Sequence, residues 1–84
     1  MSDILKNEFA QILQTKRKEL KLTQEEVAKK CHISSRQYIT LEHGLGLPTF
    51  QTLINLSIVL NIDYETFISA VVKQGYNVDK NGAV

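Results

Sequence analysis

Two helix-start signals, eleven residues apart, limit the possible folds of this chain more than any other feature. In the segment TQEE, Thr23 can accept a hydrogen bond from the backbone of Glu26, whose side chain can reach back to Thr23. The segment SSRQ repeats this capping box with Ser34 and Gln37, and Gly44 then occupies a typical helix-terminating position. The spacing therefore predicts two short helices joined by a tight turn, which is a helix-turn-helix.

Apolar residues at helical spacing predict three more helices around this pair. Residues 3–20 form the first, with an apolar stripe of Leu5, Phe9, Ile12, Leu13 and Leu20. Another helix is expected after Pro48, starting at a Thr49 cap and stopping at Asn61. We expect it to bury Phe50, Leu53, Leu56, Leu60 and either Ile58 or Val59.

The last predicted helix starts at Asp63, and its apolar residues are Phe67, Ile68, Val71 and Val72. No segment alternates apolar and polar residues for long enough to indicate a strand. We therefore expect an all-α, compact five-helix fold. Residues 1–74 would form a single domain, because 84 residues cannot supply two cores, and residues 75–84 would form a mobile C-terminal tail.

A cysteine and two histidines near the turn suggest chemistry at first sight. However, Cys31, His32 and His43 match no familiar ligand spacing and have no fourth ligand nearby, so we expect no metal. Cys31 shares a helical face with Val27 and Ala28, which favours packing over reactivity. With no phosphate-binding loop and no paired acids in an apolar setting, we expect neither a cofactor nor an enzyme.

The charge distribution favours an anionic partner for the first half of the chain. The net charge is only +1, but residues 16–36 carry seven basic side chains against three acidic ones. Residues 44–84 carry two basic side chains against three acidic ones. A solvated helix surface explains this pattern as well as a binding surface does, so charge leaves both interpretations open.

The second helix of the predicted pair has an outward face suited to DNA. Tyr38, Leu41 and part of Glu42 should face inward, which leaves an outward set of Ser35, Arg36, Ile39, Thr40 and His43. An arginine can pair with guanine, hydroxyl groups can bond several bases, and an isoleucine can contact a thymine methyl group. The preceding helix offers Gln24 and free backbone N–H groups to a phosphate. An ordinary solvated helix would explain most of these residues, but not Ile39.

The segment LTQEEVAKKCHISSRQYITLEHG is similar to the phage-repressor and Cro-like (XRE-type) helix-turn-helix family. The resemblance covers roughly residues 9 to 68 and includes PTFQTLINLSIVLNIDYETF. It depends on four features in the family's order and spacing, which are Thr23-Gln24, Ala28, Ile33-Ser34, and Glu42 followed by Gly44.

The resemblance implies a lambda-repressor-like domain that binds double-stranded operator DNA and regulates transcription. By position, the base-contacting residues would be Ser35, Arg36, Ile39 and Thr40, and the phosphate-contacting residues would be Gln24, Ser34, Gln37 and His43. Arg17 and Glu42 would form a partly buried ion pair. The protein would be cytoplasmic, without a membrane segment or a small-molecule ligand.

The family commonly acts as homodimers, and the expected interface here is Phe67, Ile68, Val71 and Val72. Phe67 and Ile68 could equally belong to the core, whereas Val71 and Val72 should lie furthest from it.

The chain departs from the family pattern at His32, Tyr38, Leu45 and Leu47. The two leucines replace residues that are often basic, which keeps an alternative open. In this alternative, the domain is a protein-interaction module, pairing with a toxin or another regulator and binding DNA weakly or not at all.

Overall fold

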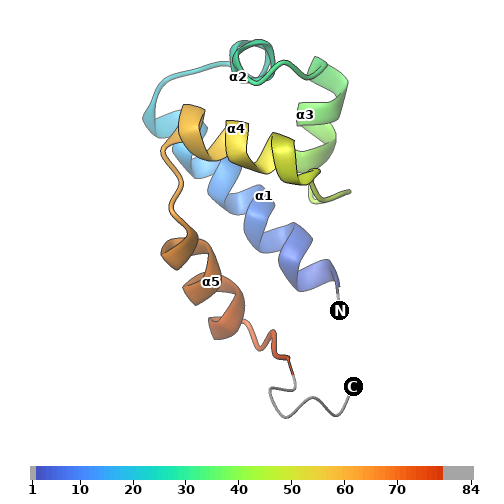
Figure 1. The fold of residues 1–84 in the computed structure, drawn as a ribbon, viewed down its shortest axis with the longest axis vertical. Helices are drawn as coiled ribbons and strands as arrows, with labels where there is room; N and C mark the ends of the chain where they lie inside the picture. Colours follow the sequence, from blue (N-terminus) through green and yellow to red (C-terminus); the bar gives the residue numbers. More distant parts are fainter. Residues whose placement is uncertain (1, 79–84) are drawn as a thin grey trace.

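The computed structural model describes residues 2–78, which fold into five helices and contain no strand (Figure 1). The helices are α1 (Ser2–Glu19), α2 (Gln24–Lys30), α3 (Ser35–Glu42), α4 (Phe50–Leu60) and α5 (Tyr64–Lys73). The prediction of an all-α, five-helix fold is confirmed. None of these helices combines the length and the apolar character needed to cross a membrane. The predicted mobile tail falls mainly on residues 79–84, which lie outside the described residues.

The predicted capping residues begin four of the helices. Thr23 and Ser34 form complete capping boxes at the start of α2 and α3. Thr49 accepts from the backbone N–H of Thr52 at the start of α4, and Asp63 accepts from that of Thr66 at the start of α5. Because each cap satisfies a backbone donor that a helix start leaves unpaired, these side chains fix where each helix begins.

Each described helix is followed within two residues by a residue in the left-handed conformation. These residues are Lys21, His32, Gly44, Asn61 and Gly75. After α3, Gly44 donates its N–H to the carbonyl of Leu41, and Leu45 donates to that of Thr40, which is a Schellman motif. Only two of the five residues are glycines, so the other three side chains hold a backbone conformation that is unfavourable for L-residues.

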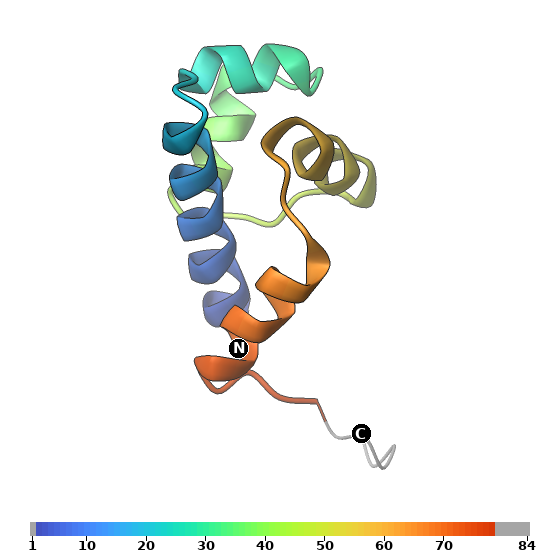
Figure 2. The same ribbon diagram turned by 90° about the vertical axis from the view of Figure 1, so that its left-hand side faces the viewer.

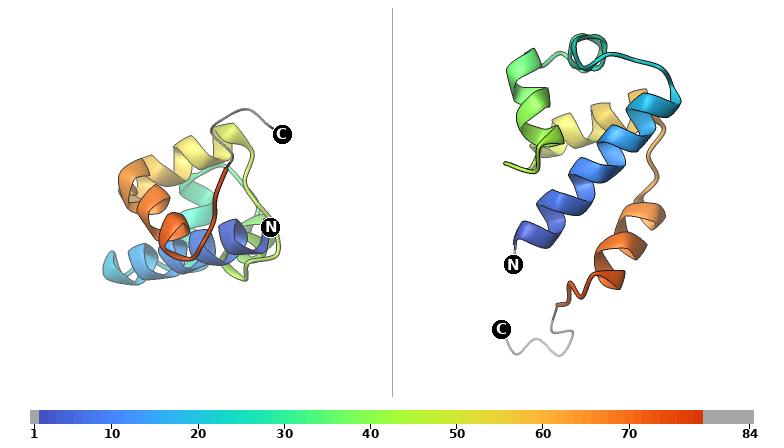
Figure 3. Two further views of the ribbon diagram at one scale, coloured as in Figure 1. Left: turned by 90° about the horizontal axis from the view of Figure 1, so that it is seen from below. Right: turned by 180° about the vertical axis from the view of Figure 1, so that it is seen from behind.

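The core lies where α1, α2, α3 and α4 meet, and Phe67 of α5 packs against it. α1 packs against α3, α4 and α5, while α2 packs against α3 and α4. Figures 2 and 3 show α5 beside the N-terminal half of α1, at the end of the molecule away from α2. The central buried residues are Phe9, Leu13, Val27, Ala28, Cys31, Tyr38, Leu41, Leu56 and Leu60. The predicted packing role of Cys31 is confirmed.

α4 differs from its prediction, because its outer face is apolar but not buried. Phe50 and Ile58 are each 74% exposed, whereas Val59 packs against the core. α4 packs against α1 and α2 and lies at the outside of the molecule in Figure 2, so its other side faces solvent. Leu20 was also predicted in the core, but it follows the end of α1 and is 47% exposed.

Candidate nucleic-acid interface

The turn between α2 and α3 brings the two helices close together. His32 has a φ angle of 60°, and its N–H donates to the carbonyl of Lys29. The N–H of Ile33 donates to the carbonyl of Ala28, which is 1% exposed between the helices. The left-handed residue reverses the chain, and the small alanine permits close approach of the helices, as in a helix-turn-helix.

The four predicted base-contacting residues share one face of α3. At about 100° per residue, Ser35, Arg36, Ile39 and Thr40 occupy a common arc, opposite the buried Tyr38. Arg36 is exposed, and among residues 2–78 its guanidinium has no hydrogen-bond or ion-pair partner. The other three residues are half-buried. This face therefore offers a free guanidinium beside two hydroxyl groups and one aliphatic side chain, which are groups that read base edges.

The four predicted phosphate-contacting residues are spread over α2 and both ends of α3. Ser34 and Gln37 are exposed, but each already uses one oxygen in the capping box. His43 is exposed at the opposite end of α3. Gln24 is half-buried, and its amide donates to a carboxylate oxygen of Glu42 at 2.8 Å. Gln24 therefore has a structural contact within the chain that the sequence did not predict.

The loop between α3 and α4 presents leucines beside this face. Leu45 is 69% exposed and Leu47 is 45% exposed. Leu47 also lines a hollow of about 320 Å³ with Arg36 and Thr40 of α3 and with Pro48 at the start of α4. The surface next to this face of α3 is consequently apolar at Leu45 and Leu47.

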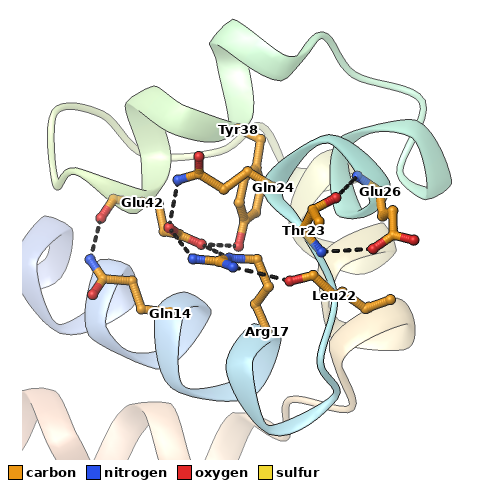
Figure 4. A network of polar contacts seen from close by, with 8 residues as sticks. All are labelled: Gln14, Arg17, Leu22, Thr23, Gln24, Glu26, Tyr38 and Glu42. Carbon is orange, nitrogen blue, oxygen red and sulfur yellow. Dashed lines mark hydrogen bonds and ion pairs between the residues drawn. The ribbon is translucent and has the colours of Figure 1, made fainter.

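A buried carboxylate ties α3 to α1 and α2 (Figure 4). Glu42 is 3% exposed and accepts from Arg17 through Nε at 2.5 Å and Nη2 at 3.0 Å. It also accepts from the Tyr38 hydroxyl at 2.6 Å and from Gln24. Its backbone carbonyl accepts from Gln14 of α1 at 2.8 Å. Among the described residues no buried side-chain polar atom lacks a partner, so this network is fully satisfied.

The network fixes the protonation states of its members. Burial alone would raise the pKa of Glu42, but hydrogen bonds from Arg17, Tyr38 and Gln24 outweigh burial and lower it below its ordinary value of 4.5. The hydrogen bond to Glu42 raises the pKa of Arg17. Burial, together with the adjacent carboxylate, raises the pKa of Tyr38. At neutral pH the site therefore contains a carboxylate, a guanidinium and a neutral phenol.

The structure places Arg17 and Glu42 in the ion pair that the family resemblance implied. Sequence reasoning missed the contributions of Tyr38, Gln24 and Gln14. One signal was present for Tyr38, because it precedes Glu42 by four residues and so lies on the same side of α3. Neither amide carried such a signal, because each reaches Glu42 from a different helix.

The predicted dimer face on α5 divides into buried and exposed parts. Phe67 packs edge-on against Phe9, with ring centroids 5.7 Å apart, and Val71 is only 3% exposed. Ile68 and Val72 are 53% and 59% exposed. Val71 therefore belongs to the chain's own core, because α5 turns this residue towards α1, and the prediction that it lies furthest from the core is corrected. The α5 face that remains consists of Ile68 and Val72, beside a hollow of about 580 Å³ that Leu5, Tyr76 and Val78 also line.

Comparison with known proteins gives one finding. A model of a helix-turn-helix family matches residues 13–67, which is more than half of the chain and includes the network of Glu42 and the outward face of α3. No curated protein and no solved structure matches the chain.

Proposed function

Because the chain belongs to the Cro and phage-repressor (XRE-type) helix-turn-helix family, a family of DNA-binding regulators, we propose that it binds a two-fold symmetric operator as a homodimer. The observation that carries the proposal is the outward face of α3. Within residues 2–78 the Arg36 guanidinium has no hydrogen-bond or ion-pair partner, while the network around Glu42 ties the helix to α1 and α2. A fixed helix with unpaired donors on its outer face suits direct readout of the major groove.

In this proposal, base and phosphate contacts come from different residues. Ser35, Arg36, Ile39 and Thr40 would read bases. Ser34, Gln37 and His43 would meet phosphates, and so would the free backbone N–H groups at the start of α2. Gln24 would keep its bond to Glu42 through one N–H of its side-chain amide, and its second amide N–H and its backbone N–H would remain for a phosphate.

Selection from random duplexes, followed by anisotropy titrations, tests sequence-specific binding. We expect one enriched palindromic sequence with half-sites about one helical turn apart. Affinity should fall by about 10³-fold between 50 and 200 mM salt if some six phosphates are neutralised. No enrichment over random duplex, or an affinity that does not change with salt, would contradict the proposal.

The homodimer is tested by stoichiometry on the selected duplex. Two chains per operator are expected in native mass spectrometry or sedimentation. Ile68→Asp should reduce the stoichiometry and weaken binding to the full palindrome, because it places a charge in the α5 face. It should leave weak binding to a single half-site, since Ile68 is 53% exposed and lies far from α3 along the chain.

One observation favours a second candidate, which is an interaction module of the same fold that binds DNA weakly or not at all. The exposed Leu45 and Leu47 stand beside α3, and the net charge of the whole chain is only +1. The same salt series distinguishes the candidates. The module would show no enriched sequence, and Leu45→Lys with Leu47→Lys would create a salt-dependent affinity that the parent chain lacks.

A further inference from the structure

α4 carries an apolar stripe on its outer surface that neither the core nor the proposed DNA contacts use. Phe50, Ile54 and Ile58 follow one another at intervals of four residues, which places them along one side of the helix. Phe50 and Ile58 are each 74% exposed, and Ile54 between them is half-buried. None of the three is among the residues that pack against the core. Figure 2 shows α4 at the outside of the molecule, on the side away from α1.

This stripe lies in a segment without charge. From Gly44 to Ile62 the sequence contains no Asp, Glu, Lys or Arg. This segment therefore offers no opposite charge to a DNA backbone or to a strongly charged protein partner. Exposed apolar patches of this kind mark surfaces that are covered by another apolar surface.

The spacing of the stripe makes it complementary to itself. If two copies of α4 pack antiparallel about a two-fold axis at Ile54, then Phe50 of each copy lies opposite Ile58 of the other. A two-fold contact uses the same patch twice, so a charged patch would oppose itself, whereas this uncharged one does not. The small net charge of +1 also leaves little overall repulsion between copies.

We propose that the stripe Phe50, Ile54 and Ile58 of α4 is a second self-association surface that joins a copy of this chain through an antiparallel α4–α4 contact. It is distinct from the α5 face, which is assigned to the operator-bound homodimer. Two different two-fold contacts on one chain combine into a closed tetramer or an open chain of dimers. The self-association does not require DNA, but its consequence, cooperative occupation of two neighbouring operators, rests on the proposed function.

Sedimentation velocity over a range of protein concentrations tests the contact without DNA. The parent chain should pass from dimer to a larger species, and Ile58→Glu should stop at the dimer, with the second association weakened about a hundredfold or more. Ile68→Asp should still form a dimer through α4, and the double variant should be monomeric. A parent chain that never exceeds a dimer, or an Ile58→Glu variant that assembles like the parent, would overturn the proposal.

Two variants separate this effect from misfolding. Thr15→Glu places the same charge on an exposed site of α1 and should assemble like the parent. Phe50→Glu places the charge in the first turn of α4, where a negative charge favours the helix, and should repeat the effect of Ile58→Glu. If Phe50→Glu is folded by circular dichroism and still forms the larger species, the stripe is not the contact.

A crosslink tests the antiparallel geometry. Ile54→Cys puts one thiol from each copy next to the proposed two-fold axis, while the native Cys31 is buried. A short bismaleimide should join two Ile54→Cys chains, and adding Ile58→Glu should abolish the product. A crosslinked yield that Ile58→Glu leaves unchanged would contradict the proposed axis.

A duplex with one operator, compared with a duplex with two, distinguishes this proposal from the DNA-binding proposal. Ile58→Glu should bind the single operator like the parent and lose cooperativity on the double one. If the parent chain does not bind the single operator, the proposed function is refuted, whereas the sedimentation result still stands. Equal cooperativity of parent and variant would refute the role of α4 on DNA.

Discussion

The guanidinium of Arg17 in α1 and the carboxylate of Glu42 at the end of α3 meet through two hydrogen bonds, 25 residues apart in sequence. This contact fixes the angle of the recognition helix against the longest helix of the fold. The Arg17 side chain is 15% exposed and that of Glu42 is 3% exposed, so water screens the pair little. The pair is therefore a structural element of the DNA-binding unit.

Replacing Arg17 should destabilise the protein far more than replacing its neighbour. Arg17→Ala leaves a buried carboxylate without its counter-charge and should lower the free energy of unfolding by about 3 kcal/mol. Lys16→Ala is the matched control, because Lys16 pairs with Glu19 at 3.9 Å on the surface and should cost at most about 1 kcal/mol. Urea denaturation of both variants measures the difference. Equal losses would show that the Arg17–Glu42 pair acts like a surface pair.

Removing the Tyr38 hydroxyl should weaken the same network without emptying the core. Tyr38→Phe keeps the buried ring but leaves Glu42 with three side-chain donor atoms in place of four. Because a hydrogen bond to a charged group is lost, we expect the free energy of unfolding to fall by about 1.5–3 kcal/mol. Thermal denaturation measures it. In an Arg17→Ala background the cost should change by more than the error of the measurement, and strict additivity would contradict a coupled network.

Stability should fall in acid because of Glu42. Its pKa is lowered in the folded protein, whereas in the unfolded chain it returns to the ordinary value of 4.5. Below pH 4.5 the unfolded state binds the proton more readily, so the free energy of unfolding decreases as the pH falls through the folded pKa. Above pH 4.5 Glu42 adds no pH dependence to the free energy of unfolding. Urea denaturation between pH 2 and 7 should show the decrease in the parent chain and a smaller one in Glu42→Gln.

His32→Gly should stabilise the fold. His32 holds a φ angle of 60° with an exposed side chain, and glycine adopts this conformation without the steric cost of a Cβ atom. We expect the free energy of unfolding to rise by about 1 kcal/mol and the operator preference to stay unchanged. Gly44→Ala should instead destabilise the fold. The alanine Cβ would lie 2.9 Å from Oδ1 of Asn7, at a residue whose φ angle is +72°. A destabilised His32→Gly variant would show that the histidine makes a favourable contact.

The division of roles on α3 can be tested with two exposed residues. Arg36→Ala should relax the preference at one base position and cost about 1–3 kcal/mol on the selected operator. His43→Ala should weaken all duplexes by the same factor, because phosphate contacts do not depend on sequence. Parallel titrations on the operator and on single-base variants measure both effects. If both variants weaken all sequences equally, Arg36 does not read a base.

The helix starts could be predicted from the sequence because their signals are local. Thr23 and Ser34 bond to groups three residues away, so the chain forms these caps whatever the rest of the fold does. The Arg17–Glu42 pair spans 25 residues, and only the family resemblance pointed to it.

The burial on α4 and α5 could not be predicted in the same way. α4 has apolar residues on nearly all sides, with four polar ones between them, so periodicity does not show which side faces the core. Phe50 was therefore expected inside but lies outside, and the choice between Ile58 and Val59 stayed open until the structure placed Val59 against the core. Val71 was expected outside but lies inside. In each case the outcome depends on the angle at which a helix crosses α1, which is set by contacts distant in sequence.

The outward face of α3 and the buried contacts of Tyr38 and Glu42 come from different residues of the same two-turn helix, and this has a consequence for how such a regulator can diverge. Ser35 and Arg36 can change without removing a buried contact, because neither is among the core residues. Glu42 and Tyr38 cannot change so freely. Gene duplicates of this chain could therefore acquire different operators while keeping one scaffold. The same separation makes the domain a suitable starting point for building sets of regulators that do not cross-react.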